Sequence, residues 1–408
     1  MTVIEYFLKW IKSAKAAERA AAAVALAHAY LRQELTFEER LSAEAALTLL
    51  LDDPSPKVRL ALSETLSLSH RAPAQVIAAL AADQVEVAAP VLVRSPLLSD
   101  GDLVDRVASG VPKVQVLIAS RPQLSLPVSA AIAEVGAAEA CLELVRNPSA
   151  RIAGLSYRRM IERHGGHAAL RAALAADRRL PADCRHLLLR RVGEALSAAP
   201  FVRALMGASR AEKLAREACA NASLTLIDAT DRSEHAALVE HLRLSGDLTL
   251  SFLIRAVAYG KIDFFGAALV SLSGQSEARV RALLAGGRDA ALSALLSRAE
   301  LSPVSHAPVL TALKIWREVA VGRRIAGPQE VSWHMLRALD GDESAEGAAL
   351  AALLRRIHLD ALRSNARREA LALAAAQRRC GGALIRYGEV IPLLAQLSVY
   401  PDSSDFRA

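Results

Sequence analysis

The sequence predicts an all-α protein in which short antiparallel helix pairs stack into an α-solenoid. Hydrophobic residues make up 53% of the 408 residues, but aromatic residues make up only 4%. The apolar surface therefore consists mainly of Ala and Leu, which favour helices, while the aromatic residues that favour strands are scarce. Turn signals also recur through the first half of the chain at intervals close to the length of one helix pair.

Each of these turns is followed by an apolar run with helical spacing. The turns lie at Asp53–Pro56, Asp83–Gln84, Gly110–Pro112, Asn147–Ser149 and Asp177. The runs that follow them are Val58–Leu68, Val87–Val93, Val114–Ala119, Ile152–Ile161 and Cys184–Leu196. Second turns at residues 95–99 and 120–125 split the intervals into two helices, and Ser99 is the expected cap of one of them. One such pair cannot bury its apolar face alone, so neighbouring pairs must stack.

The first residues form a separate amphipathic segment. Ile4, Phe7, Leu8 and Ile11 share one helical face, and Trp10 and three lysines flank it. We expect this helix to cap the open end of the solenoid, because a terminal helix pair has no neighbour to cover it. A helix lying on a membrane surface is the alternative.

Changes in composition predict three regions. Residues 1–200 form the array of helix pairs with its N-terminal cap, and a more polar stretch begins at residue 201. Residues 201–322 form a second helical segment that continues the array or packs on it, with a new pattern of short helices starting at Leu242. Residues 323–408 form a basic helical region with a loose tail.

The sharpest local motif is Asp53-Pro54-Ser55-Pro56-Lys57-Val58-Arg59, which resembles the signature of HEAT repeats. This resemblance implies that Asp53 and Arg59 belong to a ladder of polar contacts between adjacent repeats. The later turns depart from the signature, because Ala89 and Ala153 stand where the arginine is expected. An ordinary helix cap with a solvated arginine is the alternative for this motif.

A wider resemblance covers residues 20–320. The stretches Leu50–Arg59, Ala88–Leu103 and Leu248–Leu284 resemble a family of uncharacterised α-proteobacterial proteins with HEAT-like character. The resemblance implies helical repeats in the cytosol of a bacterium. It transfers no catalytic residue.

Positive charge is concentrated near the C-terminus. The net charge is +7, and between residues 355 and 386 the arginines exceed the acids by six. Arg356, Arg363 and Arg367 share one helix face and are the candidate residues for binding a partner. Such a stripe suits an acidic protein surface, nucleic acid or anionic lipid, and a solvated face is the alternative. Arginine also has GC-rich codons, so the overall basic balance is weak evidence for an anionic partner.

No pattern in the sequence predicts catalysis, a cofactor or a metal. His164 and His167 are separated by Gly165-Gly166, which interrupts the helix that paired zinc ligands require. The four cysteines stand alone, and Cys141 and Cys219 read as small core residues. A helical-repeat enzyme remains the weakest of three hypotheses, with Trp10, Trp316 and Trp333 as candidate groove aromatics.

We therefore expect a non-catalytic scaffold that binds a protein or peptide through its concave surface, with a role in bacterial signalling or regulation. The alternative is a protein that binds nucleic acid through the arginine stripe. No window of the sequence predicts a transmembrane helix or an export signal, so we expect a cytoplasmic protein. The sequence indicates no particular oligomeric state.

Overall fold

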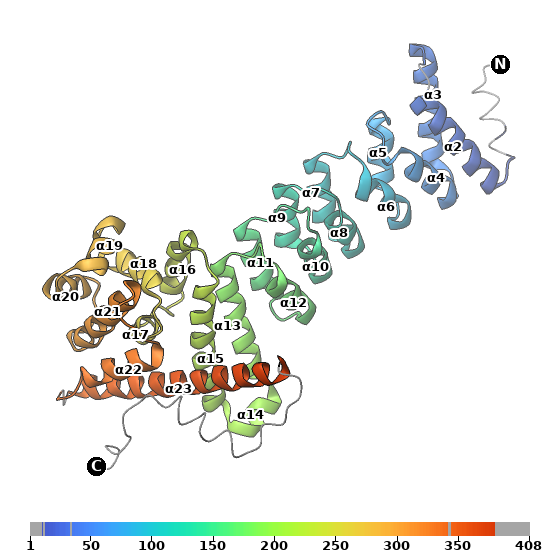
Figure 1. Cartoon of the computed structure of the whole chain (residues 1–408). Helices are drawn as coiled ribbons and strands as arrows, with labels where there is room; N and C mark the ends of the chain where they lie inside the picture. Colours follow the sequence, from blue (N-terminus) through green and yellow to red (C-terminus); the bar gives the residue numbers. More distant parts are fainter. Residues whose placement is uncertain (1–9, 11–12, 33–34, 342–343, 380–408) are drawn as a thin grey trace. The chain divides into compact units, whose positions relative to one another are not determined.

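The predicted all-α class is confirmed. A computed structural model describes residues 10, 13–32, 35–341 and 344–379, and every regular element within these ranges is a helix (Figure 1). The amphipathic segment that contains Ile4, Phe7, Leu8 and Ile11 lies outside the described residues. The chain divides into two compact units, Met1–His241 and Leu242–Ala408.

This division lies between the boundaries predicted after residues 200 and 322. Two long helices, α13 and α15, pack on each other, which keeps residues 201–241 with the first unit. The second unit begins at Leu242, where the pattern of the sequence changes.

In the first unit, one row of helices is formed by every second helix of the chain. The row consists of α2 (Ala16–Arg32), α4 (Pro56–Leu66), α6 (Val85–Arg94), α8 (Pro112–Ala119), α10 (Ala138–Arg146) and α12 (Ala168–Ala176). Each of these helices packs on the next one in the row. We call this the even row.

The helices between them form the odd row. They are α3 (Phe37–Leu49), which continues into the short 3₁₀ helix η1 (Leu50–Asp52), α5 (Ala74–Ala81), α7 (Asp100–Ala108), α9 (Leu126–Val135), α11 (Gly154–His164) and α13 (Ala182–Ala198). From α7 onward each helix packs on the next in the row, and α5 contacts η1 and α6. This contact pattern is what stacked helix pairs require.

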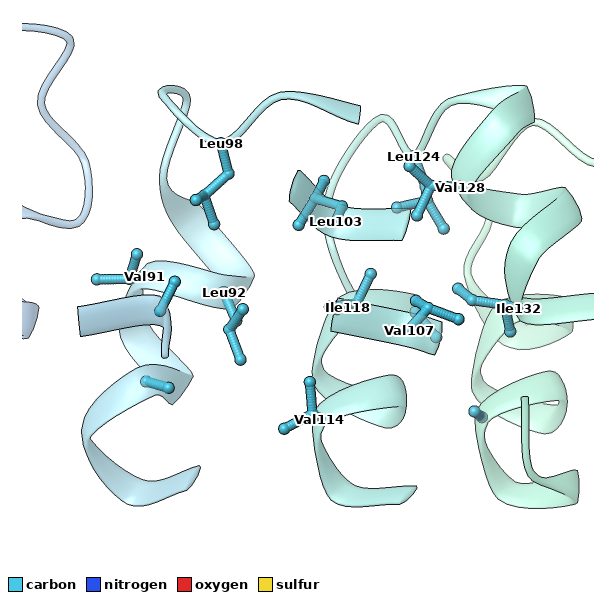
Figure 2. Packing of buried hydrophobic residues seen from close by; sticks show 14 of the residues in the cluster. Val91, Leu92, Leu98, Leu103, Val107, Val114, Ile118, Leu124, Val128 and Ile132 are labelled. Atoms are coloured by element: carbon cyan, nitrogen blue, oxygen red, sulfur yellow. The ribbon is translucent and has the colours of Figure 1, made fainter. Parts of the chain in front are cut away.

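A continuous apolar core lies between the two rows. It extends from Ala23 to Leu188 without interruption. Figure 2 shows how side chains from successive helices fill it, with Leu92, Leu103 and Ile118 among them. Each helix therefore buries its apolar face against its neighbours along the chain rather than against one common centre.

Local sequence signals set many helix starts. Pro56 occupies the first turn of α4, where its missing N–H leaves no hydrogen bond unmade. Ser99 and Asp102 form a capping box at the start of α7, in which the Ser99 hydroxyl accepts from the Asp102 backbone N–H at 3.2 Å. The Asp102 carboxylate accepts from the Ser99 N–H at 2.9 Å. The expected cap at Ser99 is thus confirmed.

The turn intervals locate the helices but do not assign them to rows. The turns at Asp53, Asp83 and Gly110 precede even-row helices, whereas those at Asn147 and Asp177 precede the odd-row helices α11 and α13. Three helices, α8 to α10, lie between Gly110 and Asn147. Both kinds of connection use the same turn residues, so their spacing alone cannot tell the two rows apart.

The first unit ends in a helical hairpin. It consists of α13, α14 (Pro200–Met206) and α15 (Ala208–Asp228), followed by η2 (Arg232–Glu234) and α16 (His235–Leu244). Gly193 lets α13 and α15 approach closely, because a Cβ atom there would lie 2.6 Å from the Cys219 sulfur. Figure 1 shows α14 at the far end of this hairpin.

The second unit is built around α17 (Leu250–Ala258). Seven consecutive residues of this helix, Phe252–Ala258, are buried, so it is enclosed on all sides. Around it lie α18 (Ile262–Ser273), α19 (Glu277–Gly286), α20 (Asp289–Arg298), η3 (Pro303–Ser305), α21 (His306–Ala320), α22 (Pro328–Arg337) and α23 (Ala345–Arg379). Of these, α18, α21, α22 and α23 contact α17 directly.

Candidate functional site

Two bidentate ion pairs connect helices of the even row to the turns that precede the next helix of that row. Arg19 on α2 donates to both carboxylate oxygens of Asp53, at 2.7 and 3.0 Å. Arg59 on α4 donates to both oxygens of Asp83, at 2.6 and 3.1 Å. Asp53 and Arg59 thus do not pair through their side chains. Each is paired with a neighbouring segment, and Arg59 also donates to the Asp53 carbonyl at 2.5 Å.

Both carboxylates are held in their charged form. The hydrogen bond from Arg19 lowers the pKa of Asp53, and the hydrogen bond from Arg59 lowers the pKa of Asp83. The same bonds raise the pKa of each arginine. The side chains in both pairs are at most 16% exposed, so water screens them less than an ordinary surface pair.

After Asp83, the contacts along the even row are made to backbone carbonyls rather than to carboxylates. Arg121, which follows α8, donates to the carbonyls of Leu92 and Ser95 at the end of α6, the latter at 2.7 Å. The side-chain amide of Asn147, which follows α10, donates to the carbonyl of Ala119 at the end of α8 at 2.9 Å. It also donates to the backbone carbonyl of Arg121 at 2.7 Å. Each helix end is thus bound by the turn that follows the next helix of the row.

Arg179 repeats this arrangement after α12. It donates to the carbonyl of Val145 in the last turn of α10, at 2.8 Å, and to those of Asn147 and Ala150 beyond its end, at 3.1 and 3.0 Å. The last carbonyls of a helix have no partner within the helix, and a cation there also interacts favourably with the helix dipole. We call Arg121, Asn147 and Arg179 the carbonyl ladder.

The carbonyl ladder was missed from the sequence. Its only signal is an arginine or asparagine within a few residues after a helix end, as in Ser120-Arg121-Pro122. No acidic residue marks the other half of the contact, because that half is backbone. Within the even row, contacts between paired side chains therefore end at Asp83, although in the odd row Arg158 on α11 pairs with Asp183 in the first turn of α13 at 2.8 Å.

The stripe of Arg356, Arg363 and Arg367 lies on α23, and all three side chains are exposed. The buried face of this helix consists of Leu350, Leu354, Ile357 and Ala361. At 100° per residue, the stripe lies on the opposite side of the helix from that face.

One acid interrupts the stripe. Asp360 lies one turn after Arg356, and its carboxylate is 3.8 Å from Arg363 and 3.5 Å from the buried Arg255 of α17. The structure thus brings the three arginines onto one exposed face, and part of their charge is offset.

A hollow of about 230 Å³ lies between α5 and α7 in the odd row. Its lining consists of Ala78, Ala81, Leu98, Asp102, Asp105 and Arg106. Asp102 is committed to the cap of α7, and its hydrogen bonds with Ser99 lower its pKa. The hollow therefore combines an apolar wall with two carboxylates and the guanidinium of Arg106, and its size suits one side chain of a bound peptide.

The histidines considered as metal ligands have structural roles. The His164 ring lies 3.0 Å from the Gly136 carbonyl, and the His167 ring accepts from the Leu170 N–H at the start of α12. No group of three or more metal-ligating side chains occurs within the described ranges.

Two of the three cysteines within the described residues lie in the core. Cys141 and Cys184 are buried, and burial raises their pKa values to about 11 and about 12. Cys219 is half-buried between α13 and α15. The thiols of Cys141 and Cys184 are therefore poor nucleophiles at neutral pH.

Ser332 and His358 form a hydroxyl–imidazole pair 3.1 Å apart, where α22 meets α23. The hydroxyl also donates to the Gln329 carbonyl at 2.9 Å, and Ser332 is fully buried. His358 lies 3.0 Å from the same carbonyl and packs on Trp333. This geometry joins the two helices and leaves the hydroxyl inaccessible.

In the part of the chain that the structure describes, no helix has both the length and the apolar character to cross a membrane.

Fold and contacts together define an all-α protein of packed helices. Within that class, the chain belongs to the family described as "Uncharacterised protein conserved in bacteria (DUF2336)", whose model matches residues 87–349. The expected family is thus confirmed, although its description covers bacteria in general rather than the α-proteobacteria alone. The match leaves out α2 to α5 and reaches into α23. No curated protein and no solved structure matches the chain.

Proposed function

We propose that this chain is a HEAT-like α-solenoid that serves as a non-catalytic scaffold, binding a protein or peptide partner in the bacterial cytoplasm. Its setting would be signalling or regulation. The observation that supports it most is the series of hydrogen bonds between the carbonyl ladder and the preceding helix ends. These bonds join residues 26 to 34 positions apart, which is one helix pair.

In this proposal Asp53 and Arg59 take the role that the HEAT signature implies. Asp53 pairs with Arg19 and Arg59 pairs with Asp83, and these two ion pairs join the first helix pairs to one another. The carbonyl ladder joins the helix pairs that follow. Neighbouring helix pairs are thereby held at a fixed spacing. A row held in this way presents its outer surface as a continuous binding face.

The hollow between α5 and α7 is the binding feature that we assign to this surface. Its apolar wall and its two carboxylates, whose charge Arg106 offsets in part, fit an amphipathic side chain of the partner. The reducing cytoplasm fits the buried free thiols of Cys141 and Cys184.

The test is affinity capture from native lysate with the full chain as bait and a variant that fills the hollow. Ala78→Trp places a large side chain in the hollow, while Ala79→Trp adds the same side chain at an exposed neighbour outside its lining. We expect one stoichiometric partner to bind wild type and Ala79→Trp and to be lost from Ala78→Trp. Absence of any stoichiometric partner, or equal capture by both variants, would contradict the proposal.

A second candidate function is nucleic-acid binding through α23. It is favoured by the exposed common face of Arg356, Arg363 and Arg367. Changing all three to Glu should weaken binding to duplex DNA and make the salt dependence shallower by about two to three in log–log slope. The charge-matched control is Arg279, Arg281 and Arg288 changed to Glu, since these are exposed elsewhere in the second unit. Equal loss in both triple variants would dismiss a specific role for the stripe.

A further inference from the structure

The helical hairpin of the first unit ends in a group of exposed apolar side chains. Phe201 and Leu205 on α14 are 74% and 67% exposed. Leu196 on α13, Met206 on α14 and Leu214 on α15 are 59%, 36% and 46% exposed. We call these five residues the apolar tip.

The apolar tip is not the outer side of a packed helix. None of the seven residues of α14 is buried, and this helix contacts only the two arms of its own hairpin among the helices that it touches closely. Phe201 and Leu205 are four residues apart, so they share one face of α14. Arg203 lies on the opposite face and donates to the Ser197 carbonyl at 3.2 Å. The tip therefore points its largest apolar side chains away from the hairpin.

Positive charge surrounds the tip. Arg203, Arg210 and Lys213 are exposed, and Glu212 is the one acid within residues 200–216; Glu194, two residues before Leu196, is paired with Arg191 at 3.1 Å. Glu212 lies 3.9 Å from Arg203 and offsets part of its charge. A convex apolar end with a basic rim has the composition of segments that insert into the surface of an anionic bilayer.

The start of α15 adds an independent feature. Its N-cap is Gly207, which has no side chain to accept from the first N–H groups of the helix. Arg210 lies in the same first turn. Backbone N–H groups and an arginine at a helix start are suited to a phosphate group, such as that of a lipid head.

A second copy of the chain fits this surface less well. In a twofold dimer the same patch meets itself, so the two basic rims would face each other and repel. A bilayer with anionic lipids instead offers acyl chains to the apolar tip and phosphates to the rim. We propose that the apolar tip is a membrane-surface attachment site that inserts Phe201 and Leu205 among anionic lipids.

The experiment is vesicle co-sedimentation of the full chain. The probes are vesicles of phosphatidylcholine with one third phosphatidylglycerol, and vesicles of phosphatidylcholine alone. We expect binding to the anionic vesicles that weakens as salt is raised. Phe201→Asp with Leu205→Asp should lower the bound fraction by at least about tenfold. Arg210→Gln and Lys213→Gln should each lower the affinity by about fivefold.

Leu155→Asp is the matched control. Leu155 is 79% exposed on α11, outside the apolar tip, so its change should leave vesicle binding unaltered. Circular dichroism should show unchanged helix content in every variant, because all the altered side chains are exposed. Partner capture should be retained by Phe201→Asp with Leu205→Asp, which separates this proposal from the scaffold function.

Three results would overturn the proposal. One is failure of wild type to bind the anionic vesicles at low salt. Another is equal binding by wild type and Phe201→Asp with Leu205→Asp. The third is a concentration-dependent dimer, measured by light scattering, that this double variant abolishes while no vesicle is bound. That outcome would assign the apolar tip to self-association.

Discussion

The two compact units bury their helices in different ways, although arginines donate to carbonyls at helix ends in both, as Arg298 does to Ser273 at 3.0 Å in the second. In the first unit each helix of the even row packs on the next, and the carbonyl ladder fastens the end of one helix to the turn after its neighbour. In the second unit α17 is buried on all sides, and helices distant in sequence close around it. Damage in the first unit should therefore stay local, whereas damage at the centre of the second should spread through all of it.

The most direct test of this comparison is to create one cavity in the core of each unit. Phe264→Ala in the second unit and Ile118→Ala in the first both remove a fully buried side chain, and each should cost about 3–5 kcal/mol of stability. Hydrogen exchange should rise across the whole second unit in Phe264→Ala. In Ile118→Ala it should rise only in α8 and the helices beside it. Equally local effects in both variants would show that the two units do not differ in cooperativity.

The packing around α17 is tested next at Gly260, which follows the helix with φ +75°. A Cβ atom there would lie 3.0 Å from the Trp316 ring, whose N–H donates to the Val257 carbonyl at 2.8 Å. Gly260→Ala should therefore cost about 2–4 kcal/mol, from the left-handed backbone and the clash together.

Gly274 is the control for that substitution. It has φ +65° and nothing within 4 Å of an added Cβ, so Gly274→Ala should cost only about 1 kcal/mol. Urea unfolding of both variants measures the difference. Equal losses would mean that Trp316 moves aside freely and that the core of the second unit is loosely packed.

A third prediction concerns the hairpin of the first unit. Gly193→Ala should cost about 1–3 kcal/mol, because its Cβ would lie 2.6 Å from the Cys219 sulfur. Changing Cys219 to Ala removes that sulfur and should restore most of the loss. Chemical unfolding of the two single variants and the double variant gives the coupling energy. Additive losses would show that α13 and α15 do not constrain each other at this point.

The last prediction concerns a pH dependence of the first unit, whose effect at each site is modest. The pKa values of Asp53 and Asp83 are lowered in the folded state by their arginine partners. Their contribution is therefore present above the unfolded pKa of about 3.9, and it is lost as the pH falls through the lower folded values.

Asp53→Asn with Asp83→Asn should cost about 1.5 kcal/mol per site at neutral pH. The same change should flatten the loss of stability on acidification below about pH 4. Thermal unfolding as a function of pH measures both. An acid-induced loss as steep as that of wild type would assign it to other carboxylates.

Much of the fold follows from the sequence because helix starts and stops depend on local chemistry. The turn at Pro54-Ser55-Pro56 starts α4, Ser276 caps α19, and α22 begins at Pro328 after Gly327. The basic helical region expected from residue 323 onward contains α22 and α23. The assignment of helices to rows did not follow, because it depends on which distant faces meet.

The candidate sites also differ in how far they follow from the sequence. The common face of Arg356, Arg363 and Arg367 follows from helical spacing alone, but the compensating contact between Asp360 and Arg255 spans 105 residues. The carbonyl ladder and the apolar tip were both missed. The first uses backbone acceptors that no sequence motif records, and the second depends on α14 being left without a buried residue by the described part of the chain.

The carbonyl ladder has a consequence for how such a chain diverges. An ion pair such as Arg59–Asp83 requires two compatible residues, so a change in one must be matched by a change in the other. A hydrogen bond from Arg179 to the Val145 carbonyl places no demand on the Val145 side chain. Successive helix pairs can then diverge in sequence while the same hydrogen bonds between them are kept. Relatives should show few correlated substitutions there, and the internal repeat should fade from the sequence long before it fades from the fold.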